Sequence, residues 1–243
     1  MSDPSLQRDV LEHLWRQFPQ HCVILGDPQT RRVVNLAAER AAVHGFNSTA
    51  QVSSWVTLMV YFGSYFDEDP QAPWAAAILR ESADASREDV LERLYSKSGD
   101  VLTEIVGEGG EYYRRALVWA RAQSFETISA GDGSGSGVQQ WLRKAYGRKY
   151  DALPDESLAG LLRLAEAATR RYGLTIRSGT LVYAQLMFLL GSFVDRDPLH
   201  PWVGLTLQDD ALSEPAIKAR TLHSRGIREL ERYMKLDRIT RKE

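Results

Sequence analysis

Two short acidic motifs offer the most obvious chemistry in this sequence. Asp67-Glu68-Asp69-Pro70 recurs as Asp195-Arg196-Asp197-Pro198, so each copy presents two carboxylates one residue apart. Carboxylate oxygens bind hard cations, and a metal-dependent hydrolase that uses Asp67, Asp69, Asp195 and Asp197 is one interpretation. An oxygen-ligand calcium site needs about six donors, however, and no fuller loop of alternating Asp, Asn and Gly follows either motif. The favoured interpretation is that these Asp residues cap a turn after a buried helix.

Other residue types give no catalytic pattern. Gly63-Ser64 and Gly191-Ser192 lack the second Gly of a nucleophile elbow, so a close helix contact explains them better. The Gly/Ser-rich stretch after residue 130 lacks the Lys of a phosphate-binding loop. None of the histidines stands at metal-ligand spacing from a second His or Cys. We therefore predict no enzyme activity, no cofactor and no metal site; the histidines are His13, His21, His44, His200 and His223.

Composition predicts a globular protein of the cytoplasm. The apolar fraction is 44% and the formal net charge is -2, which gives no global attraction to nucleic acid or to anionic membranes. Cys22 is the single cysteine, which excludes an intramolecular disulfide and favours a reducing compartment. No apolar run approaches the roughly 18 residues that span a bilayer.

The acidic motifs belong to a longer internal repeat that keeps one constant offset, the separation of Asp67 from Asp195. The segment Leu58–Trp74 matches Leu186–Trp202, and the register continues upstream to Leu14 and Leu142. Residues that both copies keep are expected to build the scaffold, with the two tryptophans as hydrophobic anchors. The repeated motif residues are Gly63, Asp67, Asp69, Pro70 and Trp74, paired with Gly191, Asp195, Asp197, Pro198 and Trp202.

The repeat and the hydrophobic pattern predict an all-α fold. We expect one domain, residues 1–243, made of two tandem repeats at 10–106 and 138–237 that pack face to face as pseudo-symmetric halves. A helix and a flexible Gly/Ser-rich linker at about 127–137 join them.

Several helix boundaries follow from local signals. Asp27 and Asp155 are expected as helix N-caps, and Gly45 and Gly173 as left-handed helix ends. A central apolar helix is expected in each copy, at 55–66 and 181–194, and residues 22–25 are the one segment that tempts a strand assignment. Other predicted helices span 87–106, 111–123 and 215–237.

Charge is unevenly distributed along the chain. From Glu81 to Glu111 nine acidic residues outnumber three basic ones, whereas residues 218–243 carry a basic surplus. Such runs are commonly solvated helix faces. The alternative is an acidic face that receives a basic protein, because complementary potentials orient association. The predicted partner-binding residues are Glu88, Asp89, Glu92, Glu104, Glu108 and Glu111.

The doubled motif Gly-Ser-x-x-Asp-x-Asp-Pro-x-x-Pro-Trp resembles a family of bacterial immunity proteins associated with type VI secretion effectors. The resemblance, which rests on 58–74 and 186–202, is to inhibitors of nuclease toxins of the Tox-REase-5 kind. It implies a protein that neutralises a cognate secreted toxin by stoichiometric binding, without direct contact with nucleic acid or membrane. An effector adaptor or chaperone and the metal-dependent hydrolase remain the alternatives.

Overall fold

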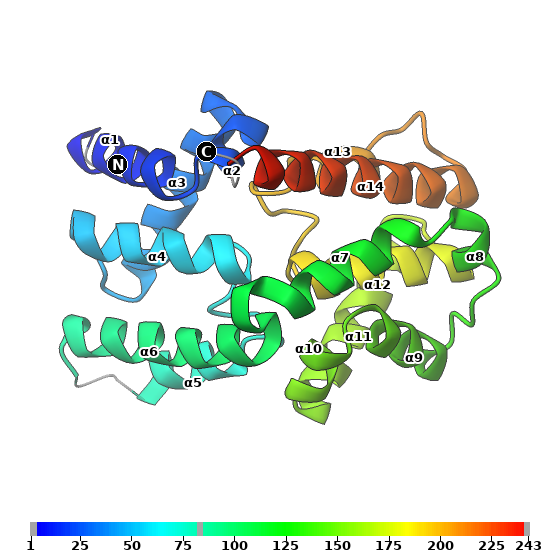
Figure 1. The fold of residues 1–243 in the computed structure, drawn as a ribbon, viewed down its shortest axis with the longest axis horizontal. Helices are drawn as coiled ribbons and strands as arrows, with labels where there is room; N and C mark the ends of the chain where they lie inside the picture. Colours follow the sequence, from blue (N-terminus) through cyan, green and yellow to red (C-terminus); the bar gives the residue numbers. More distant parts are fainter. Residues whose placement is uncertain (1–3, 82–84, 241–243) are drawn as a thin grey trace.

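The computed structural model describes residues 4–81 and 85–240, and Figure 1 shows their arrangement. The helices of the first half are α1 (Pro4–Gln17), α2 (Pro19–Leu25), α3 (Asp27–Val43), α4 (Thr49–Phe62), α5 (Pro73–Glu81) and α6 (Arg87–Val106). A short 3-10 helix, η1 (Glu108–Gly110), precedes α7 (Glu111–Ala122) and α8 (Phe125–Ser129). The second half contains α9 (Gly135–Ala145), α10 (Gly147–Ala152), α11 (Asp155–Arg171), α12 (Arg177–Leu190), α13 (Pro201–Leu207) and α14 (Pro215–Thr240).

The prediction of an all-α fold is confirmed for the described residues, which contain helices and turns but no strand. The segment 22–25, the one candidate for a strand, lies in α2. Within residues 4–81 and 85–240, no helix has both the length and the apolar character needed to cross a membrane.

Helix positions recur along the chain at the offset of the sequence repeat. The helices α3 and α11 begin and end at matching positions of the repeat, and so do α4 and α12. Three further pairs, α2 with α10, α5 with α13, and α6 with α14, begin at matching positions. Similar residues at these positions therefore form similar helices in the two parts of the chain.

Each half has its own hydrophobic core, centred on its most apolar helix. In the first half α4 buries Trp55, Leu58 and Met59, and in the second half α12 buries Tyr183 and Phe188. Leu199 is an exception to this division, because it follows α12 in sequence but is packed into the core of the first half. The two predicted central helices are thus confirmed as buried.

Two long helices, α6 and α14, each contact both halves. The C-terminal helix α14 packs against α12 and α13 of its own half and also reaches α2 of the first half (Figure 1). In the reciprocal contact, α6 packs against α10 of the second half. The helices α6 and α14 occupy matching positions, and so do α2 and α10. The two contacts between the halves are therefore equivalent.

Glycine, and not the acidic turn, ends the two central helices. We predicted ends at Phe66 and Val194, which was wrong: α4 ends at Phe62 and α12 at Leu190. The next residues are Gly63 and Gly191, whose φ angles of 95° and 113° only glycine adopts without strain. The Asp-x-Asp-Pro turn begins after these glycines.

Some of the other predicted helix caps and helix ends are confirmed and others are not. Gly45 and Gly173 have positive φ where α3 and α11 end, as predicted. Asp27 and Asp155 are the first residues of their helices and not the N-caps, which are Gly26 and Pro154. The predicted boundaries of α6 are confirmed, with Ser86 as its N-cap.

The stretch 127–137, predicted to be a flexible linker, belongs to helices at both of its ends, and only the segment between α8 and α9 is non-helical. Residues up to Ser129 belong to α8, and α9 begins at Gly135 with Ser134 as its N-cap. Gly137 is buried, and a Cβ there would lie 2.2 Å from the carbonyl oxygen of Asp132. The glycines are therefore needed for close packing and not only for flexibility.

Replacing Gly63 with Ala should destabilise the protein by about 1–3 kcal/mol, because an L side chain is strained at this φ. The added Cβ would also lie 3.2 Å from the carbonyl oxygen of Leu190 across the junction of the halves. Urea denaturation measures the change. Gly99→Ala is the matched control: Gly99 is helical within α6 and has open space around it, so this change should stabilise by about 0.5–1 kcal/mol. Equal effects of the two substitutions on stability would contradict the need for glycine at position 63.

Candidate functional site

Asp69 and Asp197 bind serines of the opposite half in a reciprocal exchange. Asp69 accepts hydrogen bonds from the backbone N–H of Ser192 at 2.7 Å and from its hydroxyl at 2.6 Å. Asp197 accepts the same two bonds from Ser64, at 2.9 and 2.6 Å. All four residues are buried. These bonds join the end of α4 to the turn after α12, and the end of α12 to the turn after α4.

The same two carboxylates also cap their own turns, as the sequence predicted. Asp69 accepts a bond from the backbone N–H of Gln71, and Asp197 accepts one from that of Leu199, both at 2.8 Å. Burial raises the pKa of Asp69 above its usual value, although the bonds from Ser192 and Gln71 oppose this. The carboxylate is therefore held by three donors that lie too deep for water to replace.

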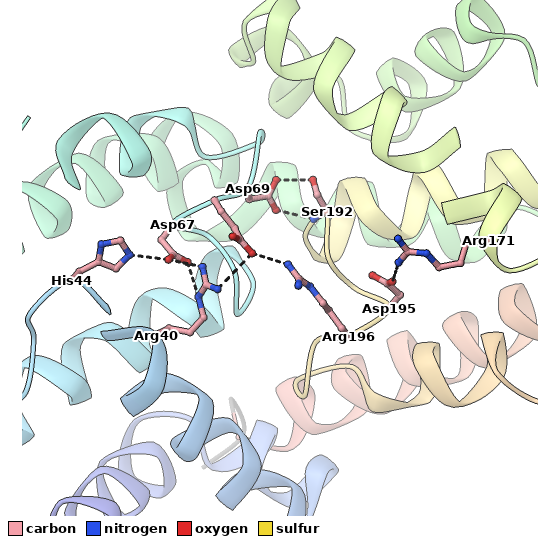
Figure 2. Close-up of polar contacts among 9 residues, drawn as sticks. Arg40, His44, Asp67, Asp69, Arg171, Ser192, Asp195 and Arg196 are labelled. Atoms are coloured by element: carbon pink, nitrogen blue, oxygen red, sulfur yellow. Dashed lines mark hydrogen bonds and ion pairs between the residues drawn. The ribbon is translucent and has the colours of Figure 1, made fainter. Parts of the chain in front are cut away.

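The first Asp of each motif binds side chains of its own half (Figure 2). Asp67 accepts a bidentate pair of bonds from Arg40, at 2.6 and 3.2 Å, and a bond from His44 Nε2 at 3.0 Å. At the matching position Asp195 accepts a bond from the Tyr172 hydroxyl at 2.7 Å, with Arg171 at 4.0 Å. Both residues fasten the turn to the end of the preceding long helix, α3 or α11.

At the centre of the junction, residues contact their own counterparts in the repeat. Glu68 and Arg196, 128 positions apart, form an ion pair of 2.6 Å. The rings of Tyr65 and Phe193, also counterparts, meet edge to face with centroids 5.7 Å apart. The Arg196 guanidinium lies over both rings, 4.1 Å from the centroid of Tyr65 and 4.5 Å from that of Phe193. This contact of cation and ring is favourable in itself.

The tryptophans and prolines of the motifs make packing contacts or accept hydrogen bonds. Trp74 lies against the first core and meets Phe62 edge to face, and Trp202 packs against the second core. Pro70 approaches α11, since a Cβ on Gly160 would lie 3.0 Å from its ring. In the opposite direction, Gln29 of α3 donates a bond to the carbonyl oxygen of Pro198. Each turn therefore contacts the other half.

The four carboxylates of the motifs are occupied by protein donors. In the part of the chain that the structure describes, no group of three His, Cys, Asp or Glu side chains gathers at a spacing that could hold a metal ion. What the arrangement does chemically is to satisfy buried carboxylates with hydrogen bonds and to hold two turns in place.

The six predicted partner-binding residues lie along α6, in η1 and at the start of α7, and they do not form a single cluster. Glu88, Asp89, Glu92, Glu104 and Glu108 are exposed and Glu111 is partly buried. The 16 residues between Glu88 and Glu104 correspond to about 24 Å of helix. These acids therefore form a stripe along α6.

Asp100 belongs to this stripe, although the predicted set omits it. It is exposed and stands 11 residues after Asp89, about three helical turns, so the two lie within about 20° of each other around the helix axis. Glu104 is one turn further on. Helical spacing from Asp89 was the signal that could have identified Asp100. Asp84, which contributes to the charge of the segment, lies outside the described residues.

Few cations balance the stripe. Glu88 accepts a bond from Gln51, and Arg93 pairs with Glu81 at 3.4 Å. No Lys or Arg among the described residues lies within ion-pair distance of Glu92, Asp100 or Glu104. The helix α6 as a whole carries five acidic residues against Arg87, Arg93 and Lys97, so the stripe presents a net negative charge to solvent.

Comparison with known proteins gives no relative. The chain matches no protein-family model, no curated protein and no solved structure.

A double-mutant cycle should detect the exchange between the halves. Ser64→Ala and Asp197→Asn should each destabilise, and together by less than their sum, with a coupling of about 1–3 kcal/mol from the shared charge-assisted bond. Ser192→Ala and Asp69→Asn should behave alike. As a control, Asp209 caps a separate turn through the N–H of Ala211, so Asp209→Asn should be additive with Ser64→Ala. Additivity in both Asp–Ser cycles would refute the exchange.

Asp67 should make folding sensitive to acid. Burial raises its pKa, but the bonds from His44 and Arg40 outweigh this and the net pKa lies below its ordinary 3.8. A lowered folded-state pKa gives stability that is present above pH 3.8 and lost as the pH falls through the folded value. The advantage of the natural protein over Asp67→Asn should therefore shrink in urea titrations from about pH 6 to about pH 3. Asp155→Asn, at an exposed carboxylate, is the control; an advantage that stays constant across this range would contradict the role of Asp67.

Proposed function

We propose that this protein is an immunity protein of the cytoplasm that binds and neutralises a cognate type VI secretion toxin, a nuclease. The observation that carries the proposal is the acidic stripe on α6, a helix in which five acidic residues outnumber three basic ones. Nuclease surfaces that hold phosphates are basic, so a stripe of exposed carboxylates about four helical turns long is complementary to them. The inhibitor would occupy the surface that the nucleic acid needs.

We also propose that the chain consists of two pseudo-symmetric halves related by an approximate twofold axis. The matching helix positions support this, and so do the reciprocal Asp–Ser bonds. Around a twofold axis, residues near the axis must meet their own counterparts, as Glu68 meets Arg196 and Tyr65 meets Phe193. On this view the motifs hold the scaffold, and the halves differ where the partner binds. The matching stretch of α14 has a basic surplus, whereas α6 is acidic.

A stable binder of this kind needs no turnover, and the engaged motif carboxylates are in keeping with that role. We therefore favour an inhibitor over a metal-dependent hydrolase. A hydrolase that uses Asp67, Asp69, Asp195 and Asp197 would have to break the bonds that hold the turns together. Titration with magnesium, manganese or calcium should then leave the melting temperature unchanged, since only a metal bound to the native state raises it.

Co-expression with the toxin encoded by a neighbouring gene tests the function. The two proteins should purify as a stable complex, and cells that carry the toxin should survive only when this protein is present. Toxicity that is equal with and without this protein would refute the immunity role. A complex that leaves toxicity intact would indicate an adaptor or chaperone instead.

Charge reversal tests the surface. Glu92→Lys with Glu104→Lys should slow association with the toxin by roughly tenfold and reduce its dependence on salt, because steering between opposite charges is lost. Glu156→Lys with Asp210→Lys changes the net charge equally at exposed sites of the second half and should have little effect. Stopped-flow measurement at two salt concentrations gives the rates. Equal slowing of association by both double variants would show that the stripe on α6 is not part of the interface.

A further inference from the structure

A cavity of about 860 Å³ lies between the halves, beside the junction formed by the acidic motifs. Its lining comes from both halves and includes counterparts from the repeat, such as Phe62 with Leu190 and Leu102 with Leu230. The wall is mainly apolar and aromatic. Cavities of this size hold drug-sized molecules, and apolar cavities bind apolar groups readily.

One end of the cavity has an ammonium group without a close counter-ion. Lys149 of α10 lines the wall, donates a bond of 2.6 Å to the carbonyl oxygen of Phe188 and lies 5.1 Å from the centroid of that ring. No carboxylate among the described residues is within ion-pair distance of its Nζ. An ammonium has three donors, so the bond to Phe188 leaves capacity for a ligand. Burial lowers the pKa of Lys149 to about 8, with Asp69 opposing, so it is still mainly charged at neutral pH.

Two other buried polar atoms of the lining have no hydrogen-bond partner among the described residues. They are the indole Nε1 of Trp74 and the amide Oε1 of Gln71. Both atoms are almost wholly inaccessible to water, so they lie behind the cavity wall and do not themselves present a free bond to a ligand. Lys149 is therefore the donor in the lining that calls for an oxygen acceptor.

The aromatic end of the cavity is uncharged. His21 of α2, the counterpart of Lys149, lies with its ring 5.0 Å from that of Tyr233, and Phe18 lies edge to face with Tyr61. Burial, with a smaller contribution from His200, lowers the pKa of His21 to about 4, so it is neutral at physiological pH. The repeat thus places a cation at one end and a neutral ring at the matching position of the other.

We propose that this cavity binds a small amphipathic anion, with an apolar body along the Leu- and Phe-lined wall and a carboxylate, or a similar oxygen group, at Lys149. The asymmetry between Lys149 and His21 sets the direction in which such a molecule lies. The cavity and the acidic stripe share part of α6, because Glu104 of the stripe and Lys97 also belong to the cavity lining.

Decanoate and 1-decanol, both at concentrations below micelle formation or saturation, are the probes. Each should displace the fluorescent anion 1-anilinonaphthalene-8-sulfonate from the natural protein, and decanoate should bind more tightly. Lys149→Met keeps an apolar stem and removes the charge, so it should weaken decanoate roughly tenfold and leave decanol unchanged. Lys144→Met, at an exposed site of α9, should change neither.

Leu102→Trp fills the cavity and should weaken both probes. Circular dichroism and thermal melting establish that each variant is folded, and decanoate should raise the melting temperature of the natural protein but not that of Leu102→Trp. Failure of decanoate to bind, or binding unaffected by Leu102→Trp, would overturn the cavity as the site. Equal weakening of decanoate and decanol by Lys149→Met would overturn the anionic end.

Discussion

The exchange of hydrogen bonds between Asp69 and Ser192, and between Asp197 and Ser64, is the interaction on which the rest of the structure depends. A buried carboxylate is costly unless donors surround it, and here the donors come from the opposite half. Neither half can therefore satisfy the second Asp of its own motif alone. The close approach that these bonds require is possible because Gly63 and Gly191 end the central helices and leave no side chain between the backbones.

This constraint explains why two cores behave as one body. The turns insert into the opposite halves, with Leu199 reaching the first core, and α6 and α14 cross to pack on α10 and α2. Such crossed contacts make the stability of one half dependent on the other. They also leave a space beside the junction, because the long helices bridge it at the sides, and that space is the cavity lined by Lys149, Trp74 and Gln71.

The helix α6 shows how one element serves several purposes. Its buried face, with Val90 and Leu94, completes the first core, and its C-terminal part lines the cavity. Its exposed face presents the acidic stripe. The helix α14, at the matching position of the sequence repeat, also packs on both halves and lines the cavity, but it has a basic surplus, so the two helices present different surfaces. Binding specificity can change on such a surface without disturbing the buried motif residues.

The sequence by itself determined the helical class, several helix boundaries and the register of the sequence repeat, because these depend on local signals such as Ser86 as a cap, Gly45 at a helix end and a constant offset between matching residues. It also identified Asp69 and Asp197 as turn caps. Only the tertiary structure decided that these carboxylates reach across to Ser192 and Ser64, that the end of the Gly/Ser stretch begins α9 with Gly137 buried, and that Lys149 and Trp74 line one cavity. These features arise from contacts that the folded chain makes in three dimensions, and the spacing of residue types along a chain carries no information about which surfaces meet.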